Sequence, residues 1–105
     1  VFAVARVAGI QAAKKTPELL PLAHVIGLHG CEVDVELADG GVAIRATART
    51  ADRTGVEMEA LTAVTVAALA VVDMVKGIDR SAVVAEAKIV AKSGGRSGNW
   101  VRPED

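Results

Sequence analysis

Residues 54–79, TGVEMEALTAVTVAALAVVDMVKGID, constrain the fold more than any other part of this chain. Between residues 60 and 72 every position is apolar except Thr62 and Thr65. A helix that is apolar on nearly all sides has to be buried. The stretch therefore predicts a long inner helix over residues 55–76, about 30 Å in length at ~1.5 Å per residue. Its uninterrupted apolar part is shorter than the ~18–20 residues that cross a bilayer, so we expect no membrane span.

Polar residues mark both ends of this predicted helix. Thr54 and Glu57 have the spacing of a capping box, in which each side chain caps a free backbone N–H at the start of a helix. Gly77 follows the last predicted turn, where glycine commonly ends a helix.

Two carboxylates lie far apart on the same face of the predicted helix. Glu59 and Asp73 are separated by fourteen residues, which places them about 21 Å apart along the axis. One copy of the helix cannot bring both to one small-molecule site. The stripe between them is made of small residues that would let another element approach closely: Ala63, Val66, Ala67 and Ala70. We therefore hypothesise a site shared across a subunit boundary.

Composition limits the class of protein. A length of 105 residues predicts one domain, residues 1–105. The chain is 51% hydrophobic with only one Phe, one Trp and no Tyr, which favours burial of further surface in a homo-oligomer. A net charge of −1 argues against general attraction to nucleic acid polymers or anionic membranes. The single cysteine, Cys31, excludes an internal disulfide, and no signal peptide is visible, so we expect a cytoplasmic protein.

The segments around the long helix predict its partners. Residues 1–15 suit an amphipathic helix, and a short turn is expected around residues 18–20. Residues 31–37 and 42–50 alternate apolar with charged side chains and are joined by Ala-Asp-Gly-Gly, which predicts an antiparallel hairpin. The acidic residues of its first strand should pair with Arg45 and Arg49 on the second. Residues 81–92 are read as a third strand.

This order predicts a fold class. Helix, strand, strand, helix and strand lack only one initial strand of the β-α-β-β-α-β order, the ferredoxin-like split βαβ arrangement. We expect an α+β fold in which an antiparallel sheet packs on long helices. Because Val1 is not a methionine, we expect the first strand to lie upstream of it.

Several polar groups are candidates for chemistry. A partly desolvated Asp73 beside Lys76 would suit acid–base catalysis, although the same spacing also stabilises ordinary helices. Glu57 is explained by capping, whereas Glu59 is not. The run from Lys92 to Gly98 suits a phosphate or is a flexible loop. His24 and His29 are either functional or structural, and with Cys31 they make a poor metal site, so no metal is predicted.

Several runs carry a resemblance to a known family. They are ARVAGIQAAK (residues 5–14), LPLAH (20–24), TGVEMEALTA (54–63), DMVK (73–76) and KSGG (92–95). With these runs the chain resembles the cyclic pyranopterin monophosphate synthase family of molybdenum cofactor biosynthesis over essentially its whole length.

The resemblance implies a fold, an assembly and a reaction. It implies a ferredoxin-like hexamer built as a trimer of dimers, with the active site at a dimer interface. The implied reaction converts 3′,8-cyclo-7,8-dihydroguanosine 5′-triphosphate, a purine-derived triphosphate, into cyclic pyranopterin monophosphate and pyrophosphate. No redox cofactor is implied, and Mg²⁺ can accompany the triphosphate.

The resemblance also assigns residues. Asp73 is the implied catalytic acid–base with Lys76 beside it, and Lys92 would contact the phosphate end. The implied substrate-binding residues are Leu22, Ala23, His24, Met58 and Glu59. The chain has Ala23-His24-Val25 where the family usually has Cys-His-Pro. The alternative reading is a catalytically impaired relative that acts as an oligomeric nucleotide-binding module.

Overall fold

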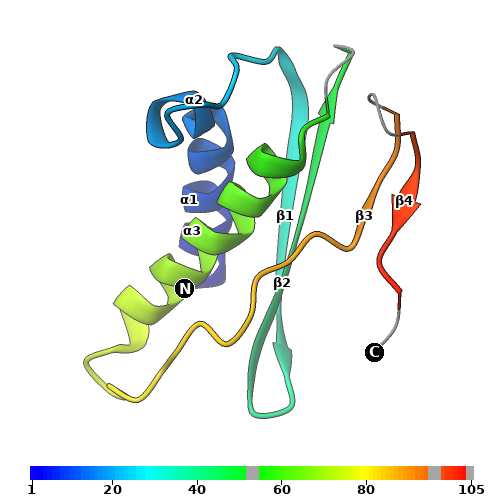
Figure 1. The fold of residues 1–105 in the computed structure, drawn as a ribbon. Coiled ribbons are helices and arrows are strands. Elements are labelled where there is room, and N and C mark those ends of the chain that lie inside the picture. Colours follow the sequence, from blue (N-terminus) through cyan, green and yellow to red (C-terminus); the bar gives the residue numbers. More distant parts are fainter. Residues whose placement is uncertain (52–54, 95–97, 104–105) are drawn as a thin grey trace.

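The computed structural model describes residues 1–51, 55–94 and 98–103. Its elements are α1 (Phe2–Lys14), α2 (Thr16–Leu19), β1 (Leu28–Ala38), β2 (Gly41–Thr50), α3 (Glu57–Val75), β3 (Ala91–Lys92) and β4 (Trp100–Val101). Helices α1 and α3 run antiparallel and side by side on one face of the β1–β2 ribbon (Figure 1). Helix α1 packs mainly on β1, and α3 packs mainly on β2. The chain therefore has the predicted α+β architecture.

The predicted hairpin is confirmed and is longer than expected. Strands β1 and β2 pair antiparallel from Leu28↔Thr50 to Ala38↔Gly41, with one irregularity between Leu28 and Gly30. The turn places Gly40 at a φ of 74°, a conformation that glycine adopts without steric cost. Arg49 donates to the Glu32 carboxylate at 2.9 Å, which confirms a cross-strand charge pair on the outer face.

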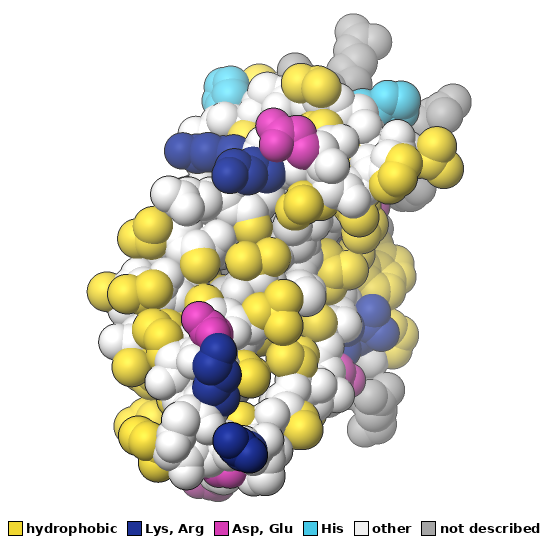
Figure 2. Space-filling view, turned by 90° about the vertical axis from the view of Figure 1, so that its left-hand side faces the viewer, with side chains coloured by type: hydrophobic (Ala, Val, Ile, Leu, Met, Phe, Trp, Pro, Cys, Tyr) yellow, Lys and Arg dark blue, Asp and Glu magenta, His cyan; other side chains and the backbone are white. Residues whose placement is uncertain are grey.

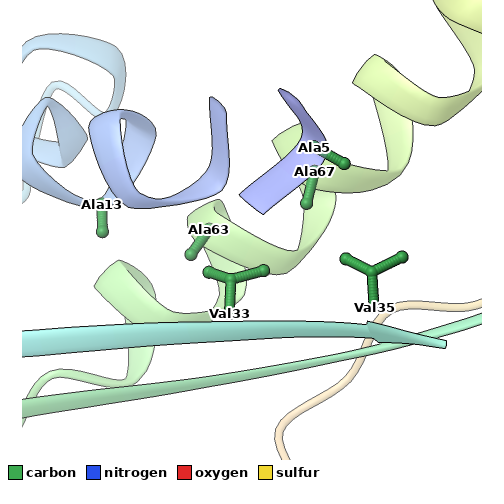
Figure 3. Packing of buried hydrophobic residues seen from close by; sticks show 6 residues of the cluster. All are labelled: Ala5, Ala13, Val33, Val35, Ala63 and Ala67. Carbon is green, nitrogen blue, oxygen red and sulfur yellow. The ribbon is translucent and has the colours of Figure 1, made fainter. Parts of the chain in front are cut away.

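The core is small and lies where the two helices meet the ribbon. It consists of Ala5, Ala13, Val33, Val35, Ala63 and Ala67 (Figure 3). Gly9 lies at the closest approach, because a Cβ on it would stand 2.8 Å from the Ala63 carbonyl oxygen and 3.3 Å from the Ala67 Cβ. The stripe of small residues on α3 thus admits α1 of the same chain. This agrees with the expectation that these small residues let another element approach closely.

Two local predictions are wrong. Residues 81–92 form no long strand: only Ala91 and Lys92 are in β3, which pairs with β4. Residues 82–90 carry the chain across from α3 without regular structure, since alternation makes a strand only where a hydrogen-bonded neighbour is available. Glu57 is the first residue of α3, with Val56 at the N-cap, so it does not stand at the third helical position of a capping box. Thr54 lies outside the described residues.

Helix α3 is less enclosed than its composition predicts. Among its described residues only Glu59, Ala63 and Ala67 are fully buried, and Leu69 is 54% exposed. By length and composition alone this helix is able to cross a membrane, contrary to our expectation. Inner helices of soluble domains pass the same test, and α3 packs against α1 and β2, so this is weak support for a span.

Candidate functional site

The predicted site residues occupy opposite ends of α3. Met58 and Glu59 lie in its first turn, near the connection from α2 to β1 that carries Leu22, Ala23 and His24 (Figure 1). Lys92 in β3 reaches the same end of the helix through an ion pair with Glu57. Asp73 and Lys76 lie at the other end, in and just after the last turn. A single chain therefore separates the predicted catalytic pair from the predicted substrate-binding residues.

Asp73 and Lys76 form an ion pair across one helical turn, and this pair lies in solvent. Lys76 Nζ donates to Asp73 Oδ1 at 2.5 Å across one helical turn. The Asp73 side chain is 70% exposed and the Lys76 side chain 65% exposed. The expectation of a partly desolvated Asp73 is wrong for the isolated chain, because the apolar run before it packs sideways on α1 and does not cover the helix end. An exposed pair of this kind contributes little to stability.

Glu59 has the opposite surroundings. It is 4% exposed and lies one turn before Ala63 on the face of α3 that meets α1. No hydrogen bond or ion pair to its carboxylate is formed by the described part of the chain. The N-terminal position on the helix favours an acidic side chain. No described side-chain oxygen that is shut off from solvent lacks a hydrogen-bond partner, so the Glu59 carboxylate keeps its oxygens in contact with solvent although the rest of the residue is enclosed. An acidic side chain in such enclosed surroundings is a candidate for function.

A half-buried ion pair joins α3 to β3. Lys92 Nζ lies 3.6 Å from Glu57 Oε1, and the side chains are 17% and 33% exposed, respectively. Both residues line a cavity of about 770 Å³ that is bounded by β2, the N-terminal half of α3 and residues 88–93. Lys92 is the one predicted site residue on this cavity wall within the described chain. A volume of this size is in the range of small-molecule pockets.

The connection from α2 to β1 presents its side chains to solvent. Leu22 is 93% exposed and His24 is also exposed. Ala23 donates its backbone N–H to the Leu20 carbonyl oxygen at 3.0 Å, which closes a turn before the rest of the connection, which has no regular secondary structure. These residues lie before β1, and the His24 side chain is exposed among the described residues, which form no hydrogen bond that fixes its ring.

The loop after β3 is described only in part. Gly94 has a φ of 72° and donates its N–H to Asn99 Oδ1 at 3.1 Å. The predicted phosphate loop also includes Gly95, Arg96 and Ser97, which lie outside the described residues. Within the described ranges, no group of three or more His, Cys, Asp or Glu side chains could hold a metal ion.

The surroundings of Cys31 do not favour a reactive thiolate. Burial raises the pKa of its thiol, with a smaller raising effect from Glu32 and an opposing effect from Lys14. A raised pKa keeps the thiol protonated near neutral pH, and the protonated form is the unreactive one.

Sequence reasoning missed the partnership of Glu57 with Lys92. It explained Glu57 as a cap and treated Lys92 alone. The two residues are 35 positions apart, and no local spacing signals that they meet. The one available hint was Gly55, two residues before Glu57, whose lack of a side chain leaves room for the carboxylate.

Comparison with known proteins gives a consistent result. The model of the MoaC family matches residues 1–95. A cyclic pyranopterin monophosphate synthase from Nocardioides sp. (strain ATCC BAA-499 / JS614) is 61% identical over 103 residues, covering 95% of this chain and 63% of the relative. The synthase of Streptomyces coelicolor is 57% identical over 101 residues, covering 96% and 59%, respectively. That of Geobacter sulfurreducens is 50% identical over 106 residues, covering 99% and 66%. The chain thus spans about three fifths of the length of these relatives.

Proposed function

Since this chain belongs to the MoaC family, we propose that it forms the greater part of a cytoplasmic cyclic pyranopterin monophosphate synthase, a lyase of molybdenum cofactor biosynthesis. Its substrate is 3′,8-cyclo-7,8-dihydroguanosine 5′-triphosphate, and its products are cyclic pyranopterin monophosphate and pyrophosphate. The observation that carries the proposal is the 50–61% identity to synthases along nearly the whole chain.

The proposed chemistry matches the groups at the two ends of α3. Opening a purine ring and rebuilding it as a pterin requires proton transfers at several atoms, for which Asp73, Lys76, His24 and Glu59 provide acids and bases. A triphosphate requires a fixed cation, and Lys92 is held in place at the cavity wall. Leu22, Ala23 and Met58 would shape the substrate-binding end. Mg²⁺ can accompany the triphosphate, and the reaction needs no redox cofactor.

The active site is proposed to form between subunits. About 21 Å of helix separates Glu59 from Asp73, at ~1.5 Å per residue. A two-fold symmetric partner presents the same surface in the opposite direction, so it can place its Asp73 beside this chain's Glu59. The proposed assembly is a homo-oligomer, a hexamer built as a trimer of dimers.

The helical face of the chain supports an assembly. Apolar side chains spread over the middle of this face, while most of its charged side chains lie toward the ends (Figure 2). Val4 and Val7 on α1 and Leu69 on α3 are each more than half exposed. Burying such residues against a second copy would remove apolar surface from water.

The test is product formation by the full-length protein. Purified protein is incubated with the cyclised GTP intermediate, and the pterin product and pyrophosphate are quantified. We expect both products from the wild type and at least about a hundredfold less from Asp73→Ala, the usual loss when a general acid–base is removed. Binding of the triphosphate without any product would contradict the proposal and favour the nucleotide-binding module.

A further inference from the structure

The Glu57–Lys92 pair has a geometry that a simple surface ion pair lacks. The pair is half-buried, with Lys92 17% and Glu57 33% exposed, and it bridges the start of α3 to the short strand β3. The 3.6 Å separation is within ion-pair distance and longer than a hydrogen bond. The carboxylate therefore holds the ammonium group by charge and leaves its three N–H donors available to a ligand.

Gly55 makes this arrangement sterically possible. A Cβ at residue 55 would stand 1.9 Å from Glu57 Oε1 and 3.1 Å from its Cδ, so the Glu57 carboxyl group folds back over the space that a side chain would fill. The blocking atoms belong to the end of a flexible side chain. An alanine at residue 55 would consequently displace the carboxylate at little cost to the fold.

We propose that Glu57 is a positioning residue that holds Lys92 for the phosphate end of the substrate, and that Gly55 provides the space for it. The inference rests on the proposed function, which supplies a triphosphate substrate. A lysine has four rotatable bonds and a strongly hydrated head. Fixing that head before binding lowers the entropy lost when a phosphate arrives.

If charge alone mattered, removing Glu57 would change phosphate binding in the opposite direction, which makes the inference testable. Glu57 partly neutralises the positive charge of Lys92, so its removal would strengthen phosphate binding if charge were the only effect. If Glu57 instead positions Lys92, its removal should weaken phosphate binding. A structural role in anchoring α3 predicts a loss of stability and no specific loss of phosphate affinity.

The experiment measures inorganic pyrophosphate binding to the full-length assembly by calorimetry, together with KM and kcat. Lys92→Ala is expected to weaken pyrophosphate binding about 10–100-fold, the usual range for a charged hydrogen bond. Glu57→Ala, Glu57→Gln and Gly55→Ala should each weaken it about 3–10-fold and raise KM more than they lower kcat. Glu32→Ala, which removes the acid of an exposed ion pair, is the matched control and should change nothing.

A double-mutant cycle decides whether Glu57 acts through Lys92. Glu57→Ala should have no further effect in the Lys92→Ala background, since the group that it positions is gone. Full additivity, or tighter pyrophosphate binding by Glu57→Ala, would overturn the inference. If Glu57→Ala fails to fold, Glu57→Gln and Gly55→Ala give the same reading. If the wild type binds pyrophosphate but forms no product, the proposed function is refuted and the inference about Glu57 stands. If the wild type does not bind pyrophosphate, the inference itself is refuted.

Discussion

The two ends of α3 carry similar residues in opposite environments. At the start of the helix Glu59 is 4% exposed and Glu57 shares a half-buried ion pair with Lys92. At the end of the helix Asp73 pairs with Lys76 at a shorter distance, yet both side chains are about two thirds exposed. The shorter contact is thus the more exposed one, and solvent screens its charges more strongly.

This difference shows what each end lacks. The first end has an enclosed Glu59 and a partly buried cation, Lys92, but lacks Asp73, the proposed catalytic acid–base. The second end has an acid–base pair but nothing to exclude water from it. Catalytic electrostatics is effective only in a dry, fixed environment. In the proposed two-fold assembly, each end would supply what the other is missing.

The strongest test of this comparison mixes two inactive variants. In a shared site, a heterodimer of Glu59→Ala and Asp73→Ala chains contains one site with both changes and one with neither. Random mixing should then restore about a quarter of wild-type activity, because half of the dimers are mixed and half of their sites are intact. Product formation after subunit exchange is the measurement. If mass spectrometry shows hybrids and activity stays at the level of the separate variants, each chain carries its own complete site.

Helices α1 and α3 pack so closely at Gly9 that we expect no larger side chain to be tolerated there. Gly9→Ala places a Cβ 2.8 Å from the Ala63 carbonyl oxygen, a backbone atom that cannot move aside alone. We expect the free energy of unfolding to fall by about 1–3 kcal/mol, although alanine has the higher helix propensity. Gly77→Ala, which meets no atom within 4 Å, is the control and should change stability little. Denaturant unfolding of both variants provides the measurement, and equal stabilities would contradict the close packing.

Replacing the two carboxylates should have different consequences for stability. Glu59→Met replaces an almost fully enclosed acidic side chain by an apolar one of similar shape, and we expect the free energy of unfolding to rise by about 1 kcal/mol. Asp73→Asn changes an exposed pair and should stay within about 0.5 kcal/mol of the wild type. Both should lose activity. A less stable Glu59→Met would mean that the carboxylate has a stabilising partner in the assembly.

The sequence predicted the helices and strands better than it predicted which residues of those elements are covered by neighbours. Local patterns suffice for the hairpin and for α3, whose observed bounds Glu57–Val75 lie within two residues of those expected. Periodicity reports which faces of an element are apolar, and it does not report what covers them. For that reason the sequence predicts a partly desolvated Asp73, which is exposed in the structure. The small residues of α3 predict a close approach by another element, and the structure shows that this element is α1 at Gly9.

The candidate site was predictable only as a set of residue types. The resemblance named Glu59, Asp73 and Lys92, and the structure adds which of them share an end of α3. The pairing of Lys92 with Glu57 depends on how residues 82–90 cross the molecule. That path has no helical or strand period, so nothing in the sequence specifies it.

The smallest predicted effect concerns the turn just beyond the exposed end of α3. Ser81 donates its hydroxyl at 2.5 Å and its backbone N–H at 2.9 Å to Asp79 Oδ1, and these hydrogen bonds, the hydroxyl first, lower the pKa of the Asp79 carboxyl group. A lowered pKa means that the folded chain favours the charged form, so the stabilising contribution is present above about pH 4 and is lost as the pH falls through the lowered pKa. In an NMR titration, Asp79 should titrate below its ordinary value, and Ser81→Ala should move the midpoint upward. Because Asp79 is fully exposed, Ser81→Ala should leave activity unchanged; a loss of activity would place this turn within the shared site and extend the functional surface past Lys76.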